Sequence, residues 1–130
     1  MTTYTALPDE YARYAIAHHE FPSELLGSAK AVAVISTQSW CPDWKAVDRS
    51  LKALVEDQKP EDFDLSIYTV IYDREKYFSE YRTMKERIWG NSFVPYIRYY
   101  VDGELVADTN QLASEGFLEV FREHMTENAR

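Results

Sequence analysis

The pattern of apolar and polar residues predicts two strands joined by a helix near the middle of the chain. Residues 31–35 form an apolar run without polar alternation, and residues 65–72 form a β-branched and aromatic run, so each run predicts a strand. A helix is predicted from Pro42 to about Gln58, because apolar residues recur there with a period of about 3.6 residues. Those residues are Trp44, Val47, Leu51, Leu54 and Val55. Strand, helix and strand in this order predict a right-handed parallel βαβ unit.

A helix is also predicted before this unit. It opens at Pro8, where Asp9 and Glu10 suit the positive end of the helix dipole. It ends near Phe21, because the residue before Pro22 is pushed out of the α-helical region. Its predicted inner face consists of Tyr11, Tyr14, Ala15 and His18.

Two more helices are predicted after the unit. The first runs from about Arg74 to Trp89 and stops at Gly90 and Asn91. Its inner face is Tyr77, Tyr81, Met84 and Ile88. Ser114 caps the last helix. The apolar residues of that helix are Phe117, Leu118, Phe121 and Met125.

A hairpin is predicted between these two helices. The apolar runs 95–101 and 104–107 flank Asp102-Gly103, and such a pair between apolar runs is a strong hairpin pattern. Combined with the parallel unit, the hairpin predicts an α/β fold. Its central mixed sheet has about four strands flanked by helices, with an additional N-terminal helix.

Composition narrows the class of protein. The 130 residues, 45% hydrophobic and 28% charged, predict one globular domain over residues 1–130. The formal charge of −8, without a block of five like charges, argues against nucleic acid and against an anionic membrane surface as partners. The longest apolar run is too short to span a bilayer. The N-terminus resembles no secretory signal and the chain has a single cysteine, so the expected location is the cytoplasm.

The segment Trp40-Cys41-Pro42-Asp43-Trp44 carries the candidate chemistry, because it lies between a predicted strand and the start of a helix. A cysteine just before a helix faces unsatisfied backbone N–H groups and the positive dipole end, which both favour the thiolate. The carboxylate of Asp43 acts in the opposite direction. A free cysteine is also often a small buried hydrophobe, so a reactive and a structural Cys41 are both open at this point.

These residues, in this order of elements, resemble the thioredoxin family over about residues 30–125. The resemblance implies a thioredoxin-like fold. It matches Cys41 with the attacking cysteine, Trp40 with the preceding tryptophan, and Pro95 with the proline that follows a cis peptide bond. It also implies a substrate groove beside Cys41, formed by Trp40, Pro42, Asp43, Trp44, Val94 and Pro95.

Two departures from the family pattern bear on function. Trp44 stands where the family has its resolving cysteine, so an internal disulfide and dithiol reductase turnover are excluded. Ile35 stands where thioredoxins have a buried aspartate that assists proton transfer. Trp44 is also in phase with Val47 and Leu51, which predicts that it packs in the core.

Two functions follow from these residues. In the first, Cys41 attacks a disulfide, forms a mixed disulfide with a protein partner or a small thiol such as glutathione, and needs no cofactor or metal. In the second, the protein is a non-catalytic thioredoxin-fold module that binds a polypeptide by strand addition. The oligomeric state stays open.

The remaining candidates are histidines and tyrosines. His18 and His19 point about 100° apart on a helix, which is poor metal geometry. His124 is expected at the surface or rim of its helix. Tyr96 and Tyr100 share one strand face just after Pro95, so they are candidates for lining the groove beside Cys41, although sheet-face packing is the commoner role.

Overall fold

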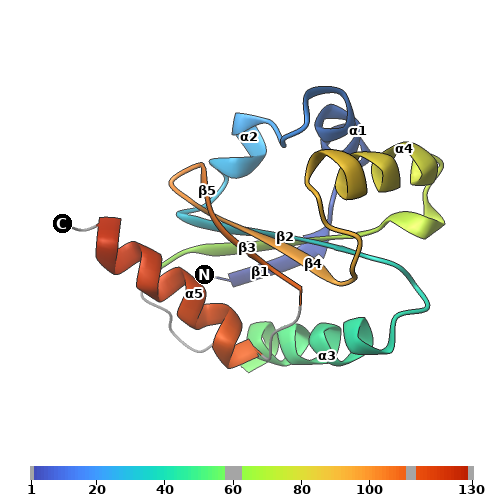
Figure 1. Cartoon of the computed structure of the whole chain (residues 1–130). Coiled ribbons are helices and arrows are strands. Elements are labelled where there is room, and N and C mark those ends of the chain that lie inside the picture. Colours follow the sequence, from blue (N-terminus) through green and yellow to red (C-terminus); the bar gives the residue numbers. More distant parts are fainter. Residues whose placement is uncertain (1, 58–62, 111–113, 129–130) are drawn as a thin grey trace.

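The computed structural model describes residues 2–57, 63–110 and 114–128 (Figure 1). The strands are β1 (Thr2–Ala6), β2 (Ala31–Thr37), β3 (Leu65–Ile71), β4 (Tyr96–Val101) and β5 (Glu104–Thr109). The α-helices are α1 (Asp9–His18), α2 (Ser23–Leu26), α3 (Pro42–Asp57), α4 (Phe78–Thr83) and α5 (Ser114–Asn128). A 3-10 turn, η1 (Tyr72–Arg74), precedes α4, and a π-helix, η2 (Met84–Ile88), continues it. The predicted end of α3 at Gln58 and the predicted capping side chain of Ser114 lie outside the described residues.

The five strands form one mixed sheet in the order β1-β3-β2-β4-β5. The central strand β2 is parallel to β3 and antiparallel to β4, so the predicted parallel βαβ unit and the predicted hairpin meet at β2. All seven residues of β2 are buried, as expected for an apolar run covered on both faces.

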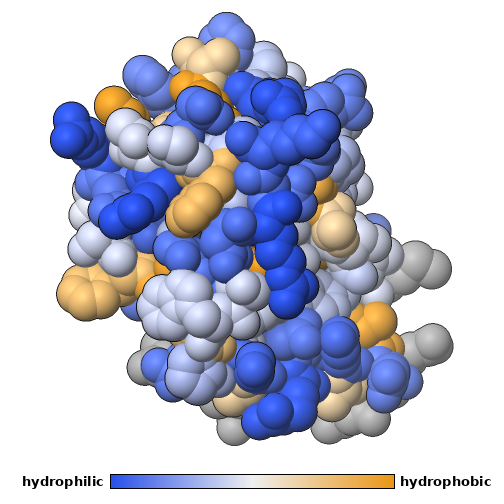
Figure 2. Space-filling model, turned by 90° about the vertical axis from the view of Figure 1, so that its right-hand side faces the viewer, coloured by the Kyte–Doolittle hydropathy of each residue, from blue (hydrophilic) through white to orange (hydrophobic). Residues whose placement is uncertain are grey.

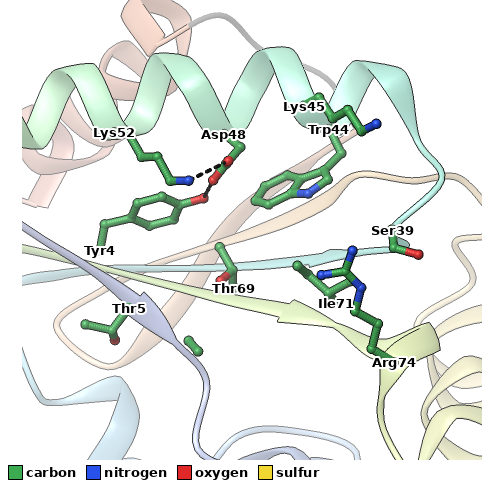
Figure 3. Close-up of a pocket in the computed structure, with 11 residues that line it drawn as sticks. Tyr4, Thr5, Ser39, Trp44, Lys45, Asp48, Lys52, Thr69, Ile71 and Arg74 are labelled. Carbon is green, nitrogen blue, oxygen red and sulfur yellow. Dashed lines mark hydrogen bonds and ion pairs between the residues drawn. The ribbon is translucent and has the colours of Figure 1, made fainter.

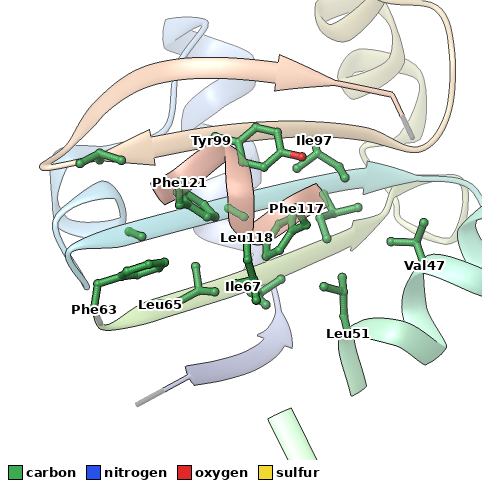
Figure 4. Packing of buried hydrophobic residues seen from close by; sticks show 14 of the residues in the cluster. Val47, Leu51, Phe63, Leu65, Ile67, Ile97, Tyr99, Phe117, Leu118 and Phe121 are labelled. Carbon is green, nitrogen blue, oxygen red and sulfur yellow. The ribbon is translucent and has the colours of Figure 1, made fainter. Parts of the chain in front are cut away.

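Helices cover both faces of the sheet (Figure 1). On one face, α3 and α5 bury a cluster that includes Cys41, Trp44 and Ile97, called the α3–α5 core below. On the other face, α1, α2 and α4 bury a second cluster, the α1–α4 core, around Tyr72 and Tyr81. In the first core, the rings of Phe63, Tyr99, Phe117 and Phe121 pack with centroid distances of 5.2–6.0 Å (Figure 4).

The sheet has one strand more than predicted, because β1 pairs in parallel with β3 at the edge. Residues 2–6 are mostly threonine, and their side chains are exposed or half-buried, so they show no apolar run. The strand is held by backbone pairing along β3 and by Tyr4, which packs against the α3–α5 core. A segment stabilised mainly by its backbone leaves little pattern in the sequence.

The predicted inner face of α1 is partly wrong. Ala15 is buried, together with Ala12, and Tyr11 is half-buried, but Tyr14 and His18 are exposed and stack on each other at 4.2 Å. The buried face of the helix thus carries the small side chains of Ala12 and Ala15, and the rings of Tyr14 and His18 lie on its solvent side. The helix also ends at His18, earlier than predicted, because His19 takes a left-handed conformation and its N–H bonds to the carbonyl of Ala15.

The predicted helix over residues 74–89 is not a regular α-helix. The chain widens into the π-helix η2, in which the N–H of Trp89 bonds to the carbonyl of Met84, five residues back. The extra residue per turn changes the phase of the inner face. Ile88, predicted inside, is therefore 52% exposed, and Lys85 is buried instead.

Candidate functional site at Cys41

Cys41 lies at the turn between β2 and α3. The N–H of Cys41 bonds to the carbonyl of Gln38, and the carbonyl of Cys41 accepts the N–H of Lys45. Pro42 then begins the helix, where its ring nitrogen needs no acceptor. Cys41 is only 3% exposed, so its sulfur is buried, whereas the next two residues, Pro42 and Asp43, are exposed to solvent.

Two contacts of opposite effect meet at the sulfur. The backbone N–H of Trp44, in the first turn of α3, donates to Sγ at 3.4 Å. This donor is one of the helix N-terminal amides that lack a partner inside the helix, and it favours a negatively charged sulfur. The thiol in turn donates to the carbonyl of Val94 at 3.6 Å, a contact that only the protonated thiol can make. The sulfur therefore has one backbone donor, the N–H of Trp44, and one backbone acceptor for its S–H, the carbonyl of Val94.

The second side of the site is the Val94–Pro95 turn, whose peptide bond is cis. Pro95 is buried and Val94 is half-buried against the core that contains Cys41. Asn110 fastens this turn, since its Nδ2 donates to the carbonyl of Pro95 at 3.2 Å and to Oδ1 of Asn91 at 2.9 Å. The sulfur thus contacts a turn whose position is held by hydrogen bonds from Asn110.

The loop before Cys41 is fixed as well. The N–H and the hydroxyl of Ser39 both donate to the carboxylate of Asp73, at 2.8 and 2.6 Å. The indole N–H of Trp40 donates to Oε1 of Gln38 at 2.6 Å, yet Trp40 is 64% exposed. Its ring is therefore held in place with most of its surface open to solvent.

Comparison with known proteins gives a match only at the level of structure. Neither protein-family models nor curated proteins match the sequence. Thioredoxin O1 from Arabidopsis thaliana is similar with a TM-score of 0.62 and 13% identity, over 93% of this chain and 96% of that chain. Trxlp from Edwardsiella tarda is similar with a TM-score of 0.58 and 20% identity, over 91% of this chain and 96% of that chain. The protein has the thioredoxin fold.

Within this thioredoxin fold, the residues that depart from the family pattern are core residues. Trp44 is buried with Val47 and Leu51, which confirms the prediction that it packs in the core. Ile35 is fully buried in the same core and offers only carbon to its neighbours. Both residues that the resemblance singled out as departures from the family pattern are therefore part of the α3–α5 core.

Lys85 is a site residue that the sequence analysis missed. It is fully buried in the π-helix, and its Nζ donates to the carbonyls of Asn91 and Phe93 at 2.9 and 2.7 Å. The ammonium also lies 5.5 Å from the ring centre of Tyr96. Lys85 therefore holds the segment that leads into Val94–Pro95. The available indication was its spacing, four residues after Tyr81 on the inner face of the predicted helix.

Burial lowers the pKa of Lys85 from 10.5 to about 8. The unfolded chain keeps the ordinary value, so between these two pH values the unfolded state binds more protons and the folded state becomes more stable as pH rises. Relative to the Lys85→Met variant, we expect the wild-type free energy of unfolding to gain on the order of 1–2 kcal/mol between about pH 7 and 9.5. Urea unfolding of both proteins at each pH measures this gain.

In that comparison, ionisation of the tyrosines, which burial opposes at Tyr81 by raising its pKa, is common to both proteins and cancels. A difference between the two proteins that does not change with pH would show that the Lys85 amine keeps its ordinary pKa in the folded state.

The other candidates do not join the site. Tyr96 and Tyr100 do not line the groove, because both hydroxyls accept from the guanidinium of Arg98 on the side of the α1–α4 core. Glu20 completes this network with a 2.7 Å ion pair to Arg98. His124 is half-buried with Nδ1 2.8 Å from the carbonyl of Val120. Within residues 2–57, 63–110 and 114–128, no cluster of three or more metal-ligating side chains is found, and no helix is long and apolar enough to cross a bilayer.

Proposed function

We propose that this thioredoxin-like protein takes part in thiol–disulfide exchange through Cys41 and forms mixed disulfides with protein partners. The observation that supports this most directly is the N–H of Trp44 donating to Sγ at 3.4 Å. A helix N-terminal amide aimed at a sulfur stabilises the thiolate, which is the species that attacks a disulfide.

The proposed step balances without a cofactor. The Cys41 thiol loses its proton to solvent, and the thiolate attacks one sulfur of a partner disulfide. A new S–S bond joins Cys41 to the partner, the old S–S bond breaks, and the leaving thiolate takes up a proton. Because Cys41 is the chain's single cysteine, release needs an external thiol such as glutathione, which attacks the mixed disulfide and returns the Cys41 thiolate.

We expect the partner to dock as a narrow, extended segment. Trp40 and Phe93, which adjoin Cys41 and Val94 in the sequence, are 64% and 70% exposed and offer apolar surface. On the face that carries the loop between β2 and α3, apolar side chains stand singly among hydrophilic ones (Figure 2). A broad apolar interface would need a contiguous patch. In this proposal the Val94–Pro95 turn holds the backbone of the segment beside the sulfur.

A second candidate is a polypeptide-binding module without chemistry. It is favoured by the 3% exposure of Cys41 and by the donation of its S–H to the carbonyl of Val94. A thiol that is buried and donates a hydrogen bond is inert until that contact opens. In this case the same exposed rings bind a partner, and Cys41 only fills space in the core.

The rate of mixed-disulfide formation distinguishes the two candidates. Reduced protein is mixed with glutathione disulfide at neutral pH, and the adduct is followed by mass spectrometry. We expect one adduct per chain, formed at least about tenfold faster than in the same protein unfolded in urea, because the folded site supplies a donor for the thiolate.

Cys41→Ser, which should give no adduct, is the matched control. A folded protein that reacts more slowly than the unfolded chain would contradict the exchange proposal and leave the binding module. The variants Trp40→Ala and Phe93→Ala separate docking from chemistry, since they should slow the reaction with a disulfide-containing peptide more than that with glutathione disulfide.

A further inference from the structure

A cavity of about 450 Å³ lies between α3 and the β1–β3 edge of the sheet, on the side of α3 that faces the N-terminal strand (Figure 3). This volume is within the range of small-molecule sites. Its floor includes the apolar side chains of Trp44 and Ile71. The remaining lining residues are polar or small, and they include Tyr4, Lys45, Asp48, Lys52 and Arg74.

The charge of this cavity is opposite to that of the protein. Three cations, Lys45, Lys52 and Arg74, line it with a single carboxylate, Asp48, although the chain carries a formal charge of −8. Cations gathered at one cavity of an acidic protein attract anions there, even though the molecule as a whole repels them.

The carboxylate of Asp48 is already neutralised by its neighbours. The hydroxyl of Tyr4 donates to Oδ1 at 2.5 Å, and Nζ of Lys52 lies 3.1 Å from Oδ2 (Figure 3). Burial and the contact with Asp48 raise the pKa of Tyr4 strongly, so its hydroxyl keeps the proton that it donates. The negative charge of Asp48 is therefore compensated, and it repels an anion in the cavity only weakly.

The other two cations have no such partner. In the part of the chain that the structure describes, neither Lys45 nor Arg74 forms an ion pair. They come from different elements, since Lys45 lies in the first turns of α3 and Arg74 ends η1 just after β3 (Figure 3). Trp44 lies next to Lys45 in α3 and shares the lining with Arg74. Two unpaired positive charges and an aromatic floor remain for an occupant.

We propose that this cavity binds a small organic phosphate, with the phosphate at Arg74 and Lys45 and an apolar or aromatic body against Trp44 and Ile71. A phosphate monoester carries a charge of about −1.5 to −2 at neutral pH, which matches two cations better than a monocarboxylate does. A guanidinium can also bind two phosphate oxygens at once. The site does not involve the sulfur of Cys41, so it goes beyond the proposed exchange function.

Phenyl phosphate, benzoate and phenol are suitable probes, because they share a ring and differ in charge. By calorimetry on the intact reduced protein at low ionic strength, we expect saturable 1:1 binding of phenyl phosphate. Benzoate should bind at least about tenfold more weakly, and phenol should show no saturable binding. Affinity for phenyl phosphate should fall as salt is added.

Arg74→Gln should weaken phenyl phosphate binding by about tenfold or more. Arg49→Gln is the matched control, because Arg49 is an exposed cation of α3 that does not line the cavity, and its removal changes the net charge equally. The control should retain wild-type affinity within about twofold. Absence of saturable binding by the wild type, or equal losses in the two variants, would overturn the proposal.

The outcome is independent of the exchange function. Cys41→Ser should bind phenyl phosphate as the wild type does, whether or not Cys41 exchanges disulfides. A protein that forms mixed disulfides but binds no phenyl phosphate would retain the proposed function and refute only this site.

Discussion

Replacing Phe121 by alanine is expected to lower the free energy of unfolding by about 3–5 kcal/mol. Phe121 is fully buried, and its ring packs against the rings of Phe63, Tyr99 and Phe117 at centroid distances of 6.0, 5.2 and 5.4 Å (Figure 4). Its removal leaves a cavity between α5 and the sheet that three large rings cannot fill without leaving their own contacts. The loss is a large part of the total stability of a typical domain, which is about 5–15 kcal/mol. Urea unfolding followed by circular dichroism measures it.

Phe93→Ala is the control for this change, since it removes the same ring from a side chain that is 70% exposed. We expect its free energy of unfolding to stay within about 0.5 kcal/mol of the wild-type value. A Phe121→Ala variant as stable as Phe93→Ala would mean that α5 does not pack on the sheet in the way described.

The substitution Trp44→Cys is expected to have two large effects. It removes a buried indole and should lower the free energy of unfolding by about 3–5 kcal/mol. It also places a second thiol one helical turn after Cys41, at a residue whose backbone nitrogen is only 3.4 Å from Sγ. Residues three apart in a helix bring their Cα atoms within the range that a disulfide spans.

If the variant is folded, we expect it to form an intramolecular disulfide under mild oxidant and to gain measurable disulfide-reductase activity. That activity should stay weak, because Ile35 offers no acid–base group. Thiol titration after oxidation gives the first result, and reduction of a protein disulfide with a dithiol-regenerating system gives the second. Trp44→Ser opens the same space without a thiol and is the control. Two free thiols in a folded Trp44→Cys protein would show that residue 44 is not equivalent to the resolving position.

The parts of the fold that could be predicted are those stabilised by buried side chains. Three such parts have a recognisable sequence pattern: the apolar run of β2, the apolar face of α3 and the Asp102-Gly103 turn. Each lies in the structure where predicted. Strand β1 could not be found in this way, because backbone pairing with β3 contributes most of its contacts. The π-helix was missed for another reason, since one extra residue in a turn changes which side chains face inward without changing their composition.

The sequence predicted the part of the candidate site whose residues are close together along the chain. It did not predict the contacts between residues that are far apart in the sequence. Cys41 immediately precedes α3 and Trp44 lies in its first turn, so the spacing sufficed to relate them. The contact of Sγ with the carbonyl of Val94 joins residues 53 positions apart, and Lys85 reaches the same turn from the π-helix. A lysine is usually interpreted as a surface residue, even where the helical spacing places it on the inner face. Burial of Lys85 could not be predicted, because only the structure shows the two carbonyls that its ammonium binds.

Val94 is the residue at which the two sides of the molecule meet. A five-stranded sheet separates the α3–α5 core from the α1–α4 core, and among the partly buried hydrophobic residues that the structure describes, only Val94 packs against both. The carbonyl of the same residue accepts the S–H of Cys41. A change of side-chain size beneath α1 or α4 that displaces Val94 therefore also moves the carbonyl that accepts the S–H of Cys41. A mutation in the α1–α4 core, on the other face of the sheet, can thus affect the surroundings of the thiol while leaving every residue of the groove unchanged.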